Sequence, residues 1–160
     1  MEEVDYCRDP ADVRSFPGLP QALQALKTEG WKIIVITNQS GIGRGYFTTE
    51  DYQAVQAELD RQLGHLLDAT YFCPDHPDIP STRRKPATGM VEEAARDWDI
   101  DLKASWFVGD KAVDVQCGQA AGCRTILVET GYGKKEATKC RPTLIASNAL
   151  EAITQIQSAA

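Results

Sequence analysis

The chain has 160 residues, of which 42% are hydrophobic and 25% charged, and its net charge at pH 7 is -6. This balance is typical of a soluble globular protein, and it argues against nonspecific binding to nucleic acid. No apolar run has membrane length, and five scattered cysteines, an odd number, argue against a disulfide framework and for a reducing compartment. We therefore expect one cytoplasmic domain over residues 1–160, with neither a nucleic-acid nor a membrane partner.

Short apolar runs alternate along the chain with segments of helical periodicity. The pattern predicts a helix from Leu19 that ends at Gly30, a buried parallel strand at 32–36, a Gly-rich loop at 37–46, and a helix over 49–63 capped by Thr48 with Asp51 as partner. A short strand at 70–73 and a proline-rich loop at 74–86 follow.

The second half of the chain continues the alternation. A helix is predicted around 91–98, then a strand at 105–108, a helix to about residue 121, a strand at 125–128, a turn-rich segment at 129–142, a short strand at 144–145 and a closing helix capped by Asn148. Strands that alternate with helices in this way are typical of an α/β fold with a doubly wound parallel sheet. In such sheets ligands bind at the carboxyl ends of the strands.

Polar residues follow the first predicted strand. Thr37, Asn38, Gln39 and Ser40 offer hydroxyl, amide and backbone N–H groups that could hold a phosphoryl oxygen without adding charge. The alternative is a turn rich in capping residues, and this segment alone does not decide between them.

Two further segments carry charged groups. Arg84 and Lys85 could neutralise a phosphate, or they could belong to a solvated basic loop. Asp110 follows the strand at 105–108 and is a hard oxygen ligand suited to Mg²⁺, with Asp114 one helical turn further on. The alternative role for Asp110 is to cap the following helix.

Taken together, these segments resemble the haloacid dehalogenase (HAD) superfamily of phosphohydrolases. The resemblance is closer to the D,D-heptose 1,7-bisphosphate phosphatases and the related histidinol-phosphate phosphatases. It is carried by Thr37-Asn38-Gln39-Ser40-Gly41-Ile42-Gly43-Arg44-Gly45-Tyr46-Phe47, by Arg84-Lys85-Pro86 with Gly89-Met90, and by Val108-Gly109-Asp110-Lys111.

The resemblance implies a Mg²⁺-dependent phosphatase that acts on a small phosphorylated metabolite of carbohydrate metabolism through an aspartyl-phosphate. Thr37 and Asn38 would bind the phosphoryl group, Lys85 would stabilise its charge, and Asp110, with Asp114 as a possible second ligand, would hold the metal. The implied substrate contacts are Tyr6, Gln39, Ser40, Arg44, Arg84 and Lys111, with Glu3 and Asp5 in the same N-terminal segment as Tyr6. No insertion suggests a cap domain, so the resemblance implies a capless monomer.

The sequence departs from this family at its beginning. The family starts with an apolar strand that ends in Asp-x-Asp-Gly-Thr, where the first Asp is the nucleophile and the second is the general acid, and these 160 residues contain no such motif. Residues 3–10 match the segment directly after it. We therefore expect the HAD-like, Rossmann-type fold to lack its first central strand, so that the strands near Ile33 and Phe107 face a gap, and we expect the chain as given to be inactive.

Relatives often hold a structural Zn²⁺ in the loop before Arg-Lys-Pro. Here His76 stands one position too late after Cys73, and the second cysteine pair is replaced, so the sequence does not predict a zinc site. Cys73 is instead expected to be a small buried residue.

Three functional hypotheses remain. The first is hydrolysis of D-glycero-D-manno-heptose 1,7-bisphosphate by the complete form of the protein. The second is hydrolysis of histidinol phosphate. The third is an inactive HAD-like module that binds phosphate and a cation through the same residues.

Overall fold

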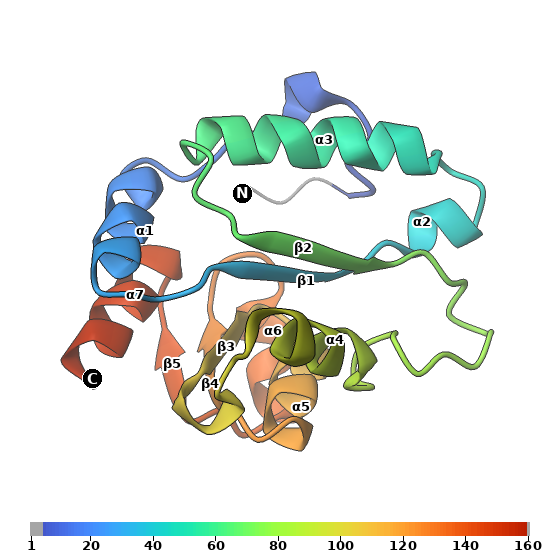
Figure 1. The fold of residues 1–160 in the computed structure, drawn as a ribbon. Helices are drawn as coiled ribbons and strands as arrows, with labels where there is room; N and C mark the ends of the chain where they lie inside the picture. Colours follow the sequence, from blue (N-terminus) through green and yellow to red (C-terminus); the bar gives the residue numbers. More distant parts are fainter. Residues whose placement is uncertain (1–4, 160) are drawn as a thin grey trace. The chain divides into compact units, whose positions relative to one another are not determined.

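The computed structural model describes residues 5–159, which fall into two compact units, 5–81 and 82–159 (Figure 1). Each unit is described by itself below, and the expectation of one domain over residues 1–160 stays a prediction. No helix in the described part of the chain has both the length and the apolar character needed to cross a membrane.

The first unit is built on two parallel strands. Its elements are η1 (Pro10–Asp12), α1 (Leu19–Thr28), β1 (Ile34–Asn38), α2 (Ser40–Gly43), α3 (Thr49–Gln62) and β2 (Ala69–Cys73). The strands β1 and β2 pair in register from Ile34 opposite Ala69 to Asn38 opposite Cys73. The helix α3 lies along one face of this pair, where the rings of Tyr52 and Phe72 meet at a centroid distance of 4.8 Å (Figure 1).

Local capping chemistry fixes where α3 begins. The Thr48 hydroxyl accepts a hydrogen bond from the Asp51 amide at 3.1 Å, and the Asp51 carboxylate accepts one from the Thr48 amide at 2.8 Å. This reciprocal capping box satisfies two backbone donors that the helix itself leaves open. The predicted cap is therefore confirmed.

The strand β1 differs from its sequence prediction. It begins two residues later than expected, at Ile34, and all five of its residues are half-buried rather than buried. The sheet formed by the described residues of this unit has two strands only, so β1 is not enclosed as a central strand of a larger sheet would be. The apolar composition of β1 predicts full burial. The actual burial depends on which strands and helices pack against β1, and the local sequence does not specify them.

A buried carboxylate ties α1 to the starts of both strands. Asp68 precedes β2, and its oxygens lie 2.6 Å from Lys27 Nζ and 2.7 Å from the Ile33 amide, with Lys32 Nζ at 3.7 Å. Burial raises the pKa of Asp68, but the hydrogen bonds from Lys27 and Ile33 outweigh it, so the pKa lies below its ordinary value. Asp68 therefore stabilises the unit in its charged form.

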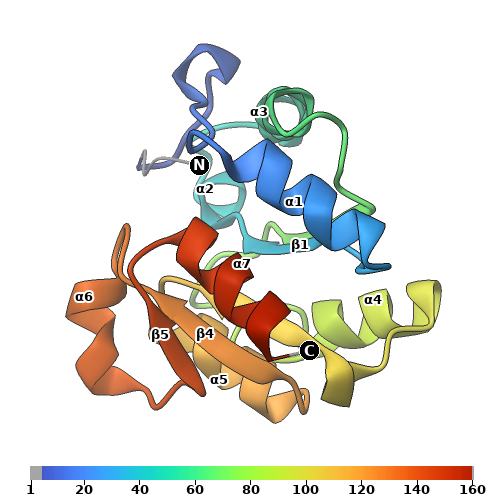
Figure 2. The same cartoon turned by 90° about the vertical axis from the view of Figure 1, so that its left-hand side faces the viewer.

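The second unit contains three parallel strands between helices. Its elements are α4 (Gly89–Trp98), η2 (Leu102–Ala104), β3 (Trp106–Gly109), α5 (Ala112–Ala120), β4 (Arg124–Val128), α6 (Gly133–Glu136), η3 (Ala137–Lys139), β5 (Leu144–Ala146) and α7 (Ala149–Ser158). The strand order is β3-β4-β5, and α5 and α7 cover opposite faces of this sheet (Figures 1 and 2). Asn148 caps α7 as predicted, since its side chain accepts from the Leu150 and Glu151 amides.

The central strand β4 forms the core of the second unit. Thr125, Ile126 and Leu127 have no exposed surface. The helix α5 packs closely here, because a Cβ on Gly118 would lie 2.5 Å from Phe107 Cβ and 2.8 Å from Thr125 Cγ2. In contrast, β3 pairs with no described strand other than β4, and its Val108 is 39% exposed.

The predicted fold class is thus confirmed at the level of an α/β protein with parallel strands. The described residues do not form one continuous doubly wound sheet, because their strands divide into a pair and a triplet. The strand that contains Phe107 and the strand that follows Ile33 belong to different sheets, and the expected gap between them stays a prediction. The absence of a central strand itself stays a prediction.

The Asp68 contacts generate a prediction about acid stability. Asp68→Asn should lower the free energy of unfolding at pH 7 by about 1–3 kcal/mol, because two charge-assisted hydrogen bonds are lost. Since the folded pKa is depressed, the stabilisation is full above about pH 4–5 and is lost as pH falls through the folded pKa. Urea unfolding between pH 7 and pH 3 should therefore show a steeper loss for the wild type than for Asp68→Asn.

Asp12→Asn provides the matched control, since Asp12 is exposed in the same unit and its side chain makes no recorded hydrogen bond. Equal pH dependence of the wild type and Asp68→Asn would contradict the assignment.

Candidate functional site

The first group of predicted site residues lies at the carboxyl end of β1. Thr37 and Asn38 are its last two residues, opposite Phe72 and Cys73 of β2. Gln39 extends the pairing, because its amide donates to the Cys73 carbonyl at 2.8 Å, and its side-chain Nε2 donates to Thr37 Oγ1 at 2.9 Å. The hydroxyl and amide groups of this segment are therefore held at one end of the strand.

The short helix α2 continues directly from this segment. Ser40 is its first residue, and Arg44, which is exposed, follows its last residue and donates its backbone N–H to the Ser40 carbonyl at 2.9 Å. Gly43 donates to the Pro74 carbonyl at 2.9 Å, and a Cβ at position 43 would lie 2.5 Å from the His76 nitrogen. Only a glycine allows this approach, which fixes the loop after β1 against the loop after β2.

Two exposed aromatic residues stand next to this loop. The rings of Tyr6 and Tyr46 meet edge to face with a centroid distance of 4.9 Å, and they are 48% and 51% exposed. Tyr6 was predicted as a substrate contact, but the pairing with Tyr46 was not, since the two residues are far apart in sequence. Glu3, from the same predicted segment, lies outside the described residues.

The second group lies at the carboxyl end of β3 in the second unit. Asp110 follows Gly109, and its Oδ2 accepts a hydrogen bond from the Tyr132 amide at 3.0 Å. Lys111 Nζ lies 4.1 Å from the centroid of the Tyr132 ring, a cation–π contact. Asp110 therefore does not cap α5, which was the alternative reading, and the sequence did not indicate the contribution of Tyr132.

A nearly buried ion pair joins two of the predicted residues. Lys85 Nζ lies 2.7 Å from Asp114 Oδ1, and the two side chains are 10% and 7% exposed. Asp114 is the third residue of α5, and its Oδ2 also accepts from the Lys111 amide at 3.0 Å. A buried cation needs such a partner, because an isolated charge would not be tolerated at this depth. The pair holds the Lys85 ammonium in one position.

The backbone at Gly109 leaves room for this pair. A Cβ on Gly109 would collide with the Asp114 side chain. Arg83 lies two residues before Lys85 in the sequence. Its guanidinium pairs with Glu93 of α4 through two hydrogen bonds of 2.8 and 2.9 Å. Arg84 lies between Arg83 and Lys85 and is half-buried.

The second unit offers a ligand for Mg²⁺. Oδ1 of Asp110 accepts no hydrogen bond from residues 5–159, which leaves one hard oxygen, whereas both oxygens of Asp114 are engaged. Those residues contain no group of three or more His, Cys, Asp or Glu side chains arranged to hold a metal. Mg²⁺ commonly uses only one or two carboxylates and completes its shell with water and phosphate, so Asp110 fits this ion.

Cys73 and His76, which were considered above as zinc ligands, have different partners in the structure. Cys73 is fully buried, as predicted, and its Sγ lies 3.3 Å from Asp75 Oδ2 and 3.6 Å from Ser81 Oγ. His76 Nδ1 instead lies 3.5 Å from Asp78 Oδ2. The polar groups of this loop therefore pair with each other.

Comparisons with known proteins agree with the geometry of the second unit and with the order of the motifs. Residues 82–152 match the model of HAD-hydrolase-like proteins. This match defines the class as that of the HAD-like hydrolases.

Individual relatives narrow the class to a family. The chain is 40% identical over 148 residues to a D-glycero-D-manno-heptose-1,7-bisphosphate 7-phosphatase from Thermosynechococcus vestitus, covering 84% of this chain and 76% of the relative. It is 38% identical over 133 residues to a D-glycero-beta-D-manno-heptose-1,7-bisphosphate 7-phosphatase from Bordetella bronchiseptica, covering 81% and 74%. The chain belongs to the family of D-glycero-D-manno-heptose-1,7-bisphosphate 7-phosphatases.

A solved structure from this family is similar over the whole chain. The crystal structure of D,D-heptose 1,7-bisphosphate phosphatase from B. bronchiseptica, complexed with magnesium and phosphate, has a TM-score of 0.90 and 31% sequence identity. The similarity covers 100% of this chain and 93% of that one.

The ion pair generates a stability prediction. Asp114→Asn keeps the side-chain shape but removes the negative charge that lies 2.7 Å from the nearly buried Lys85 ammonium, so the free energy of unfolding should fall by about 3–5 kcal/mol. Urea denaturation followed by circular dichroism measures this loss. Asp97→Asn, at a largely exposed position of α4, should change stability by less than about 0.5 kcal/mol. A similar small effect at position 114 would show that the pair contributes little.

Proposed function

We propose that this chain belongs to a Mg²⁺-dependent phosphatase that removes the 7-phosphate of D-glycero-D-manno-heptose 1,7-bisphosphate. The observation that carries the proposal is the buried ion pair between Lys85 and Asp114, next to the available oxygen of Asp110. A fixed cation and a metal ligand at one strand end are what a transferring phosphoryl group requires. The sugar is inferred from the relatives, which are heptose bisphosphate phosphatases.

Lys85 and Asp110 have separate electrostatic roles in this proposal. The Lys85 ammonium neutralises charge on the phosphoryl oxygens as the ester bond breaks, and Asp114 positions that ammonium. Asp110, through Oδ1, would hold Mg²⁺, which when bound would offset the charge of the phosphate. We assign Asp114 to Lys85 rather than to the metal, because both of its oxygens are already engaged.

The remaining predicted residues bind and select the substrate in this proposal. Thr37 and Asn38 donate hydrogen bonds to phosphoryl oxygens. The sugar side is lined by the following side chains: Tyr6, Gln39, Ser40, Arg44, Arg84 and Lys111. Arg44 suits a second phosphate, since its guanidinium is exposed and makes no recorded ion pair within residues 5–159.

The nucleophile is not among these 160 residues, which contain no Asp-x-Asp-Gly-Thr. We propose that catalysis needs a strand that carries this motif. Its first carboxylate would attack phosphorus and form an aspartyl-phosphate while the second carboxylic acid protonates the leaving sugar oxygen. Water would then cleave the acyl phosphate and release inorganic phosphate. This proposal is supported by β3, which pairs with β4 alone among residues 5–159, so its other edge could accept a further parallel strand.

The test compares two proteins on aryl phosphate, heptose bisphosphate and histidinol phosphate. The 160-residue chain should release no phosphate, whereas the chain preceded by an apolar segment ending in Asp-x-Asp-Gly-Thr should be active and should lose activity with EDTA. Heptose bisphosphate should be the best substrate of the three. An inactive extended protein that still binds phosphate would instead support a noncatalytic phosphate-binding module, the candidate favoured by the missing motif.

Two substitutions in the extended protein test the assigned roles. Lys85→Ala and Asp110→Asn should each lower kcat by about 10²-fold or more, since each removes charge stabilisation in the transition state. Only Asp110→Asn should also raise the Mg²⁺ concentration needed for half-maximal activity. Lys103→Ala, at an exposed lysine of the same unit, is the matched control and should retain full activity.

A further inference from the structure

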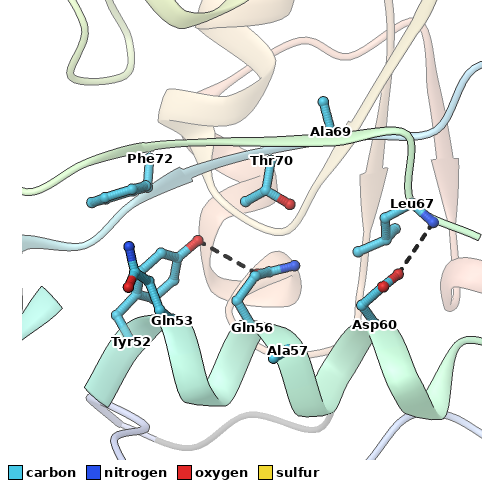
Figure 3. A pocket seen from close by; sticks show the side chains of 9 residues that line it. All are labelled: Tyr52, Gln53, Gln56, Ala57, Asp60, Leu67, Ala69, Thr70 and Phe72. Atoms are coloured by element: carbon cyan, nitrogen blue, oxygen red, sulfur yellow. Dashed lines mark hydrogen bonds between the residues drawn. The ribbon is translucent and has the colours of Figure 1, made fainter. Parts of the chain in front are cut away.

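The first unit contains a pocket that the proposed phosphatase site does not use. It lies between α3 and β2, has a volume of about 390 Å³, and includes no residue of the 37–44 segment (Figure 3). This volume is within the usual range for small-molecule sites. The pocket is lined by residues from one face of the helix, from the strand and from the connection before it: Tyr52, Gln53, Gln56, Ala57, Asp60, Leu67, Ala69, Thr70 and Phe72.

One part of the pocket is apolar and firmly packed. The Tyr52 ring is 4% exposed and lies against the Phe72 ring at 4.8 Å, and Leu67 and Ala69 extend the apolar lining. Burial raises the pKa of Tyr52, so its hydroxyl stays protonated and donates towards Gln56 Oε1 at 3.4 Å. The pocket thus offers a preformed surface for the carbon face of a ligand.

The polar part of the pocket has unused hydrogen-bonding capacity. Gln56 Nε2 is buried and has no partner among residues 5–159, and Figure 3 shows this side chain projecting from α3 into the space below β2. The Thr70 hydroxyl points from β2 towards the same space and makes no recorded hydrogen bond (Figure 3). A buried donor without an acceptor destabilises a protein, whichever way the amide is turned. Such a group is best explained by a ligand that supplies the missing bond.

The charges around the pocket restrict the ligand. Its lining has no lysine or arginine, and its one carboxylate, Asp60, already contacts His65 Nδ1 at 2.9 Å and the Leu67 amide at 3.3 Å. A phosphate or carboxylate would find no cation and would be repelled by Asp60. A metal ion would find one engaged carboxylate. Amide and hydroxyl groups, which both donate and accept, match the hydroxyl groups of a neutral ligand.

We propose that the pocket between α3 and β2 is a second ligand site that binds an uncharged carbohydrate ring. The carbon face of the ring packs on the half-buried Phe72, which the buried Tyr52 ring holds in place, while its hydroxyls bond to Gln56 Nε2 and the Thr70 hydroxyl, with Gln53 at the exposed rim. The site does not depend on the phosphatase assignment, because it uses none of the same residues.

NMR titration of the ¹⁵N-labelled 160-residue chain with D-mannose tests the site, with inorganic phosphate as the second probe. Mannose should shift the amides of residues 52–60 and 69–72 and the Gln56 side-chain amide saturably, with a Kd of about 1–10 mM, as expected for a small neutral ligand. Phosphate should leave these signals unchanged. Absence of saturable shifts up to about 50 mM mannose, or shifts located elsewhere, overturns the proposal.

Two variants separate binding from folding. Gln56→Leu removes the buried amide and Thr70→Val removes the hydroxyl with little change of shape, and each should weaken mannose binding about tenfold, the loss of one hydrogen bond. Gln56→Leu removes an unsatisfied donor but also removes the acceptor of the Tyr52 hydroxyl, so its melting temperature should stay close to that of the wild type. Gln24→Leu, the same change on the exposed face of α1, should bind like the wild type. Unchanged affinity in both pocket variants overturns the proposal.

Discussion

The second unit depends on one interaction, the ion pair between the Lys85 ammonium and the Asp114 carboxylate. Burying an unpaired charge costs several kcal/mol, and the 2.7 Å contact between the two nearly buried groups offsets part of that cost for both. Asp114 also accepts the Lys111 amide at the start of α5. One carboxylate therefore sets the position of a cation and the start of a helix, and both are coupled to the strand end that carries Asp110.

In the first unit, backbone contacts rather than charges organise the predicted phosphate loop. Gln39 continues the pairing of β1 with β2, and Gly43 brings the loop within hydrogen-bonding distance of Pro74. The hydroxyl and amide groups near Thr37 are thereby presented from a segment that is fixed at both ends. Asp68 performs the corresponding task at the opposite end of the strands, where it joins the Lys27 side chain to the Ile33 amide.

The features that the sequence predicted well are those governed by local chemistry. The caps at Thr48 and Asn148 and the parallel α/β class follow from residue types at short spacing. The motifs around Thr37, Lys85 and Asp110 were recognisable because each consists of contiguous residues. The half-buried state of β1 was not predictable, because exposure depends on which strands lie beside it. The contact from Tyr132 to Asp110 was equally hidden, since its donor is a backbone N–H that every residue except proline carries.

Within the described part of the second unit, β3 pairs only with β4, and this has a consequence for the behaviour of the chain. A parallel strand edge with an exposed valine, and with no charged or proline residue within the strand to block pairing, is a template for backbone hydrogen bonding with another polypeptide. Two copies of the chain can satisfy each other's edge groups in this way. Concentrated solutions should therefore form intermolecular sheets, and a short apolar peptide that covers the edge should keep the copies apart.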